Sequence, residues 1–146
     1  MRKIIKYIKD ELDGFYDKSE VDSFCFLIVN HLLGFSKSDM LLKPDAEVSS
    51  ADAEMAKQIV SRLKKYEPIQ YILGTTEFYG LPFIVEQGVL IPRFETEELV
   101  DLIVKQHKGK EKLKILDFGA GSGCIAISLK KNLPDAEVWC CDISDI

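Results

Sequence analysis

A short apolar segment that runs directly into three alternating glycines is the feature that most constrains this chain. Residues 115–118 have the character of a buried parallel strand, and Gly119, Gly121 and Gly123 follow them. Glycines at this spacing let the backbone turn sharply and approach a ligand closely. Ser122 is the candidate N-cap of the helix expected next, whose N-terminus would face that ligand. The sequence therefore predicts a strand, glycine loop and helix of the nucleotide-binding kind.

The next predicted strand ends at an acid, which narrows the type of ligand. Residues 137–141 lead into Asp142, whose carboxylate is placed to accept hydrogen bonds from both hydroxyls of a ribose. Cys124 stands where a dinucleotide-binding fingerprint has its third glycine or alanine, so the loop suits a ligand without a pyrophosphate. The candidate cofactor-binding residues are Asp117, Gly119, Ala120, Gly121, Ser122, Gly123 and Asp142.

Composition and charge exclude several classes of protein. The formal net charge is −5, so the chain lacks the basic excess of a protein that binds nucleic-acid phosphates. No apolar run approaches the length of a membrane span, and no secretory core follows the charged first residues, which predicts a cytoplasmic protein. The four cysteines form no Cys-x-x-Cys pair and there are only two histidines, so no metal site is expected.

Three parts follow one another along the chain. Residues 1–74 carry the apolar periodicity of amphipathic helices, with Ser19 as one expected N-cap, and predict a small helical bundle. Strand-forming residues around Gly80 then predict a β-hairpin linker over residues 75–92. Residues 93–146 begin an α/β domain of the Rossmann-like kind.

A second motif, P-R-F-E-T-E at residues 92–97, lies between the hairpin and the glycine loop. Thr96 is a good N-cap, and acids suit the positive end of a helix. Capping does not account for Pro92 and Arg93. This pair fixes an arginine just before a helix that is expected to lie beside the glycine loop. The candidate substrate or interdomain residues are therefore Pro92, Arg93, Glu95, Thr96 and Glu97.

Together these motifs resemble the family of peptide chain release factor glutamine methyltransferases. The segments that carry the resemblance are residues 68–74, 77–81, 91–93, 95–97, 117–123 and Asp142. The resemblance implies methyl transfer from S-adenosylmethionine to the side-chain amide nitrogen of the glutamine in the Gly-Gly-Gln loop of release factors. It also implies that the helical domain helps to recognise the release factor, while the α/β domain binds the cofactor and delivers the methyl group.

Two departures from the family pattern leave alternatives open. Phe94 stands where the family usually has proline. The family also uses an Asn-Pro-Pro-Tyr motif to hold the target amide, and none of the five prolines here is adjacent to another, so no catalytic residue is assigned. A sister family that methylates a ribosomal-protein glutamine shares Pro92-Arg93 but usually lacks the Thr-Glu continuation, which favours the release-factor branch.

We therefore expect the N-terminal portion of such a methyltransferase, truncated within its α/β domain, inactive by itself and able to bind the cofactor weakly or not at all. One flank of the strand at residues 115–118 would lack a neighbour, which leaves an unpaired apolar edge. Two other classes of protein remain. One is an amino-methyltransferase of nucleic acids, against which the net acidity argues, and the other is a non-enzymatic module whose bundle docks a partner protein. The sequence does not indicate an oligomeric state.

Overall fold

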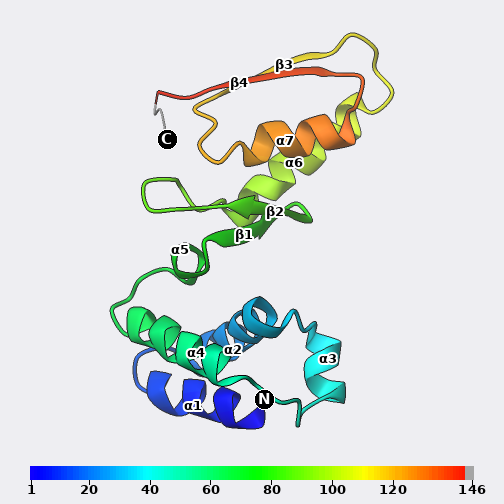
Figure 1. Cartoon of the computed structure of the whole chain (residues 1–146). Helices are drawn as coiled ribbons and strands as arrows, with labels where there is room; N and C mark the ends of the chain where they lie inside the picture. Colours follow the sequence, from blue (N-terminus) through cyan, green and yellow to red (C-terminus); the bar gives the residue numbers. More distant parts are fainter. Residues whose placement is uncertain (144–146) are drawn as a thin grey trace. The chain divides into compact units, whose positions relative to one another are not determined.

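The computed structural model describes residues 1–143, and the chain divides into two compact units, Met1–Leu73 and Gly74–Ile146. A helical region, an antiparallel hairpin and the start of an α/β domain follow one another in that order, which confirms the predicted fold class (Figure 1). The last three residues of the expected α/β part, residues 144–146, lie outside the described residues.

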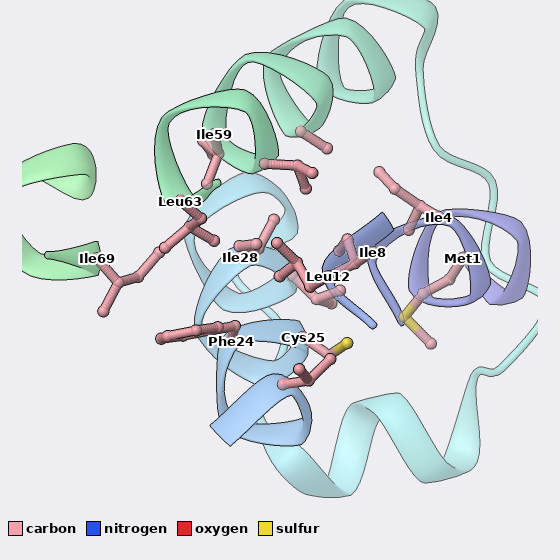
Figure 2. Close-up of a cluster of buried hydrophobic side chains, with 14 residues drawn as sticks. Met1, Ile4, Ile8, Leu12, Phe24, Cys25, Ile28, Ile59, Leu63 and Ile69 are labelled. Atoms are coloured by element: carbon pink, nitrogen blue, oxygen red, sulfur yellow. The ribbon is translucent and has the colours of Figure 1, made fainter. Parts of the chain in front are cut away.

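The first unit is built from five helices. They are α1 (Arg2–Leu12), α2 (Lys18–Leu33), α3 (Lys37–Leu42), α4 (Ser50–Leu63) and α5 (Ile69–Leu73). Apolar side chains from α1, α2 and α4 gather in one cluster, where Ile8, Leu12, Ile28 and Leu63 are fully buried (Figure 2). Burying one apolar stripe from each helix is what holds helices of this length together. Within the described part of the chain, no helix has both the length and the apolar character needed to cross a membrane.

Capping side chains determine where two of these helices begin. Ser36 Oγ accepts a hydrogen bond from the Asp39 N–H at 3.1 Å, and the Asp39 carboxylate accepts one from the Ser36 N–H at 3.1 Å. This reciprocal pair is a capping box at the start of α3. Ser49 Oγ accepts a hydrogen bond from the Asp52 N–H at 3.0 Å and so caps α4.

The N-cap predicted for α2 is wrong by two residues. Asp17 occupies that position with an extended backbone, and its carbonyl accepts hydrogen bonds from the N–H groups of Glu20 and Val21, each at 3.0 Å. Ser19 therefore lies inside the first turn. Aspartate and serine are comparable N-caps, so residue type alone does not show which of two neighbouring candidates begins the helix.

The second unit begins with a hairpin and continues as a strand–helix–strand unit. Its elements are β1 (Thr75–Phe78), β2 (Leu81–Ile84), α6 (Phe94–His107), β3 (Lys114–Phe118), α7 (Cys124–Asn132) and β4 (Glu137–Cys141). β1 and β2 pair antiparallel, whereas β3 and β4 pair parallel with Ile115 opposite Val138. A parallel pair needs a crossover, and α7 supplies it.

The two faces of the β3–β4 sheet differ in burial. Ile115 and Val138 pack against the apolar core of the second unit. On the opposite face Leu116, Phe118 and Trp139 are 64%, 87% and 51% exposed. Among the described residues, β3 and β4 pair only with each other, so each strand has one unpaired edge.

Leu63→Ala should lower the free energy of unfolding of the helical unit by about 2–5 kcal/mol, because it leaves a cavity in the core. Leu41→Ala is the matched control. That leucine is also helical but 82% exposed, so its truncation should change stability by less than about 0.5 kcal/mol. Urea unfolding followed by circular dichroism measures both changes, and equal costs would contradict the assigned core.

Ser128→Ala should stabilise the second unit by up to about 1 kcal/mol. The Ser128 hydroxyl is fully buried in α7 and has no hydrogen-bond partner within residues 1–143, so its removal abolishes a desolvation cost. Ser61→Ala, at an exposed position of α4, reports the gain in helix propensity alone. Thermal unfolding of the two variants gives the difference, and a loss of stability in Ser128→Ala would show that the hydroxyl is satisfied.

Candidate functional site

The glycine loop connects β3 to α7 and is closed onto the end of β4. The N–H groups of Gly119 and Ala120 donate to the Cys141 carbonyl at 2.8 and 3.1 Å. Gly119 and Gly121 have φ angles of 80° and 54°, in the left-handed region that glycine adopts at little cost. A Cβ atom at either position would meet no other group within 4 Å, so the bare backbone faces open space.

Asp142 follows β4 directly and lies against this loop. Its Oδ2 accepts a hydrogen bond from the Gly121 N–H at 2.8 Å, and both residues are exposed. A hydrogen bond from a backbone amide to a carboxylate is short and fixes the orientation of the carboxylate. The structure therefore places an oriented, solvent-accessible carboxylate at the mouth of the loop.

Asp117, near the end of β3, contacts the helix that follows the loop. Its Oδ2 accepts a hydrogen bond from the Ala126 N–H, in the first turn of α7, at 3.3 Å. A carboxylate at this end of a helix is favoured by the partial positive charge of the free N–H groups. Asp142 thus contacts the loop itself, whereas Asp117 contacts the helix that follows it.

Gly123, rather than Ser122, is the N-cap of α7, so the predicted cap is wrong. Gly123 has a φ of 72°, and its carbonyl accepts from the Ile127 N–H at 2.9 Å. Burial raises the pKa of Cys124, with the Ser122 side chain acting in the opposite direction, and Cys124 packs as a small apolar residue beneath the loop.

The helix after Pro92 begins earlier than predicted. α6 starts at Phe94 with Arg93 as its N-cap, and the Thr96 N–H donates to the Arg93 carbonyl at 3.0 Å. The prediction of Thr96 as N-cap is therefore wrong. Thr96 lies in the first turn between Glu95 and Glu97, where acids stabilise the positive end of the helix without a side-chain cap.

Glu97 contacts the hairpin. Its Oε1 accepts a hydrogen bond from the Tyr79 N–H at 2.9 Å, and the Tyr79 hydroxyl donates to Asp101 Oδ1 at 3.3 Å. Lys105 pairs with Asp101 one turn further along α6. Burial, together with Asp101, raises the pKa of Tyr79. Sequence reasoning missed Tyr79 and Asp101, although the Tyr79-Gly80 turn and the four-residue spacing of Glu97, Asp101 and Lys105 are visible signals.

The candidate residues form two groups. Within residues 1–143, no hydrogen bond or ion pair joins residues 92–97 to the glycine loop. A hollow of about 830 Å³ runs along α6, and its lining includes Tyr79, Phe94 and Glu97 but no residue of the loop. The structure thus brings Asp117 and Asp142 together with the loop, and places the second motif with the hairpin.

Comparison with known proteins relates both units to one kind of enzyme. Residues 3–74 match the family described as PrmC N-terminal domain, and residues 95–146 match the family described as Methyltransferase small domain. A release factor glutamine methyltransferase from Bacteroides thetaiotaomicron is 48% identical over 145 residues, which is 99% of this chain and 51% of the relative. One from Flavobacterium psychrophilum is 45% identical over 137 residues, which is 92% of this chain and 48% of the relative.

The chain spans about half the length of the curated relatives that it matches. The similarity nevertheless covers the helical unit and the glycine loop together. This chain therefore belongs to the release factor glutamine methyltransferase family.

Proposed function

We propose that the protein to which this chain belongs methylates peptide chain release factors in the cytoplasm. The methyl group passes from S-adenosylmethionine to the side-chain amide nitrogen of the glutamine in the Gly-Gly-Gln loop. The observation that supports this best is the bare glycine loop with the Asp142 carboxylate hydrogen-bonded to it. It occurs in a chain whose relatives are named for this activity.

The residues present fit the nucleoside end of this cofactor. The exposed backbone of Gly119, Ala120 and Gly121 offers a surface without side chains, and Ser122 and Gly123 complete the turn into α7. Asp142 would accept hydrogen bonds from the ribose hydroxyls, while Asp117 holds the loop against α7. Bound there, S-adenosylmethionine supplies an electrophilic methyl group on its sulfonium centre.

Residues at the start of α6 are proposed to contact the substrate. Arg93 and Glu95 are exposed, and Pro92 and Thr96 are half-buried beside them. An amide nitrogen is a poor nucleophile, so most of the acceleration must come from orientation and from the local electrostatic environment. Exposed charged groups at a helix N-terminus are suited to orienting a polar loop of the substrate. No residue of this chain is assigned to the methyl transfer itself.

Asp142→Ala should weaken the binding of S-adenosylhomocysteine, the product form of the cofactor, by about tenfold or more. The variant loses a carboxylate that accepts hydrogen bonds, and such bonds to charged groups contribute about 1.5–3 kcal/mol. Asp135→Ala is the matched control, because Asp135 is an exposed aspartate in the turn before β4. Isothermal titration calorimetry measures all three affinities. An unchanged affinity in Asp142→Ala would contradict the proposed cofactor site, whereas no heat from the folded chain would show that this chain alone does not complete it.

The chain should also bind a release factor, and Asp142→Ala should leave that affinity unchanged. The reason is that we assign recognition to the helical unit, which is compact and has its own core. Biolayer interferometry with an immobilised release factor gives both dissociation constants. Release-factor binding without any cofactor binding would indicate an interaction module, whereas no release-factor binding would contradict the assignment of the helical unit.

A further inference from the structure

The turn of the hairpin holds a tyrosine in an unfavourable backbone conformation. Tyr79 and Gly80 connect β1 to β2 with φ angles of 51° and 69°. Two left-handed residues in succession are the geometry of a type I′ turn, which matches the twist of the flanking strands. Gly80 adopts it at little cost, but a bulky residue such as Tyr79 seldom does. An additional interaction is therefore needed to hold Tyr79 there.

Two carboxylates on one face of α6 supply that interaction. Glu97 Oε1 accepts from the Tyr79 backbone N–H at 2.9 Å, and Asp101 Oδ1 accepts from the Tyr79 hydroxyl at 3.3 Å. Glu97 and Asp101 are four residues apart, so they lie one above the other on the helix. Lys105 Nζ, at 2.5 Å from Asp101 Oδ2, fixes the second carboxylate in turn. Tyr79 is therefore held at its backbone and at the end of its side chain.

Phe78, which precedes Tyr79, packs in the apolar cluster that lies beneath the glycine loop. Phe78 is 1% exposed and belongs to one apolar cluster with Phe83, Val100 and Cys124. Cys124 is the first residue of α7 and follows Gly123 directly. A rotation of the hairpin turn would withdraw Phe78 from this cluster, and close-packed interiors transmit such displacements to their neighbours.

We propose that Glu97 is a positioning residue, which holds Tyr79 in its left-handed conformation and thereby fixes the hairpin against the core that supports the glycine loop. Glu97 acts through Tyr79 and Phe78 and need not touch cofactor or substrate. The part of this proposal that concerns cofactor affinity rests on the proposed function, whereas the part that concerns the hairpin does not.

Amide hydrogen exchange in the ¹⁵N-labelled chain tests the hairpin contact without any ligand. Glu97→Ala should speed exchange of the Tyr79 amide by about tenfold or more, because a hydrogen bond to a charged group is lost. Glu97→Gln keeps an oxygen acceptor at the same position and should retain most of the protection. Glu98→Ala is the matched control, since Glu98 is exposed and no hydrogen bond or ion pair is recorded for it within residues 1–143. Unchanged exchange in Glu97→Ala, or equal damage in Glu97→Gln, would overturn the proposal.

Titration of the same variants with S-adenosylhomocysteine tests the link to the loop. Glu97→Ala should weaken binding by roughly 2- to 30-fold, the range expected for coupling through packed side chains, and Glu98→Ala should not. Faster Tyr79 exchange without any loss of affinity would overturn this link. If the unmodified chain does not bind the ligand, this chain alone does not complete the cofactor site and the link to the loop is overturned for it, whereas the exchange result still decides the role of Glu97 in the hairpin.

A double variant that also carries Tyr79→Gly provides a second test if Glu97→Ala alone does not fold. Tyr79→Gly removes the left-handed strain, because glycine adopts this conformation freely. Adding Glu97→Ala to Tyr79→Gly should then speed exchange of the residue-79 amide, which still loses its acceptor, but should change exchange of the other hairpin amides by less than twofold, roughly the error of additivity between independent sites. A large further effect on those other amides would show that Glu97 acts on something other than the conformation of residue 79.

Discussion

The second unit depends on one small apolar core. A two-stranded sheet is only marginally stable in water, and β3 and β4 form such a sheet within the described residues. Phe78 from the hairpin, Val100 from α6 and Leu129 from α7 meet in this core, each at most 1% exposed. The sheet rests on it through Ile115 and Val138. The hairpin and α6 therefore share the apolar core that supports the glycine loop.

The loop itself is ordered by hydrogen bonds within the chain. Gly119 and Ala120 donate to Cys141, Gly121 donates to Asp142, and Gly123 donates to the Ala120 carbonyl at 2.8 Å. Satisfying these N–H groups internally fixes the backbone before any ligand arrives. What such a loop offers to a ligand is its shape and the carboxylate beside it. A preorganised surface of this kind lowers the entropic cost of binding.

Sequence periodicity was sufficient to predict the elements but not their contacts. The strand expected at residues 137–141 coincides with β4, because its apolar run is bounded by a turn and by Asp142. Helix starts were less certain, since Thr96 and Ser122 are good N-caps in isolation while Arg93 and Gly123 hold those positions in the structure. The topology of a strand–helix–strand unit brings Asp142 to the loop, so that pairing could be expected from sequence.

The contact between Tyr79 and Glu97 could not be expected in the same way. It joins a turn to a helix eighteen residues further along the chain, and it depends on how the hairpin is oriented on α6. The Tyr79-Gly80 turn and the four-residue spacing of Glu97 and Asp101 are visible in the sequence, but they do not indicate which partner each residue contacts. Hydrophobic patterns report which side of an element is buried, whereas a hydrogen bond between two elements requires their relative placement.

The two faces of the β3–β4 sheet differ in burial, and this difference explains why the geometry of the glycine loop depends on how the elements of the second unit pack. Leu116, Phe118 and Trp139 give β3 and β4 the nearly continuous apolar character of strands that are buried on both faces in α/β proteins. Within residues 1–143, packing supports the sheet from the α7 side alone. The backbone at the carboxyl ends of both strands is consequently oriented by α7 and by the core beneath it. Any interaction that tightens this core, as the hairpin does through Phe78, acts directly on the geometry of the glycine loop.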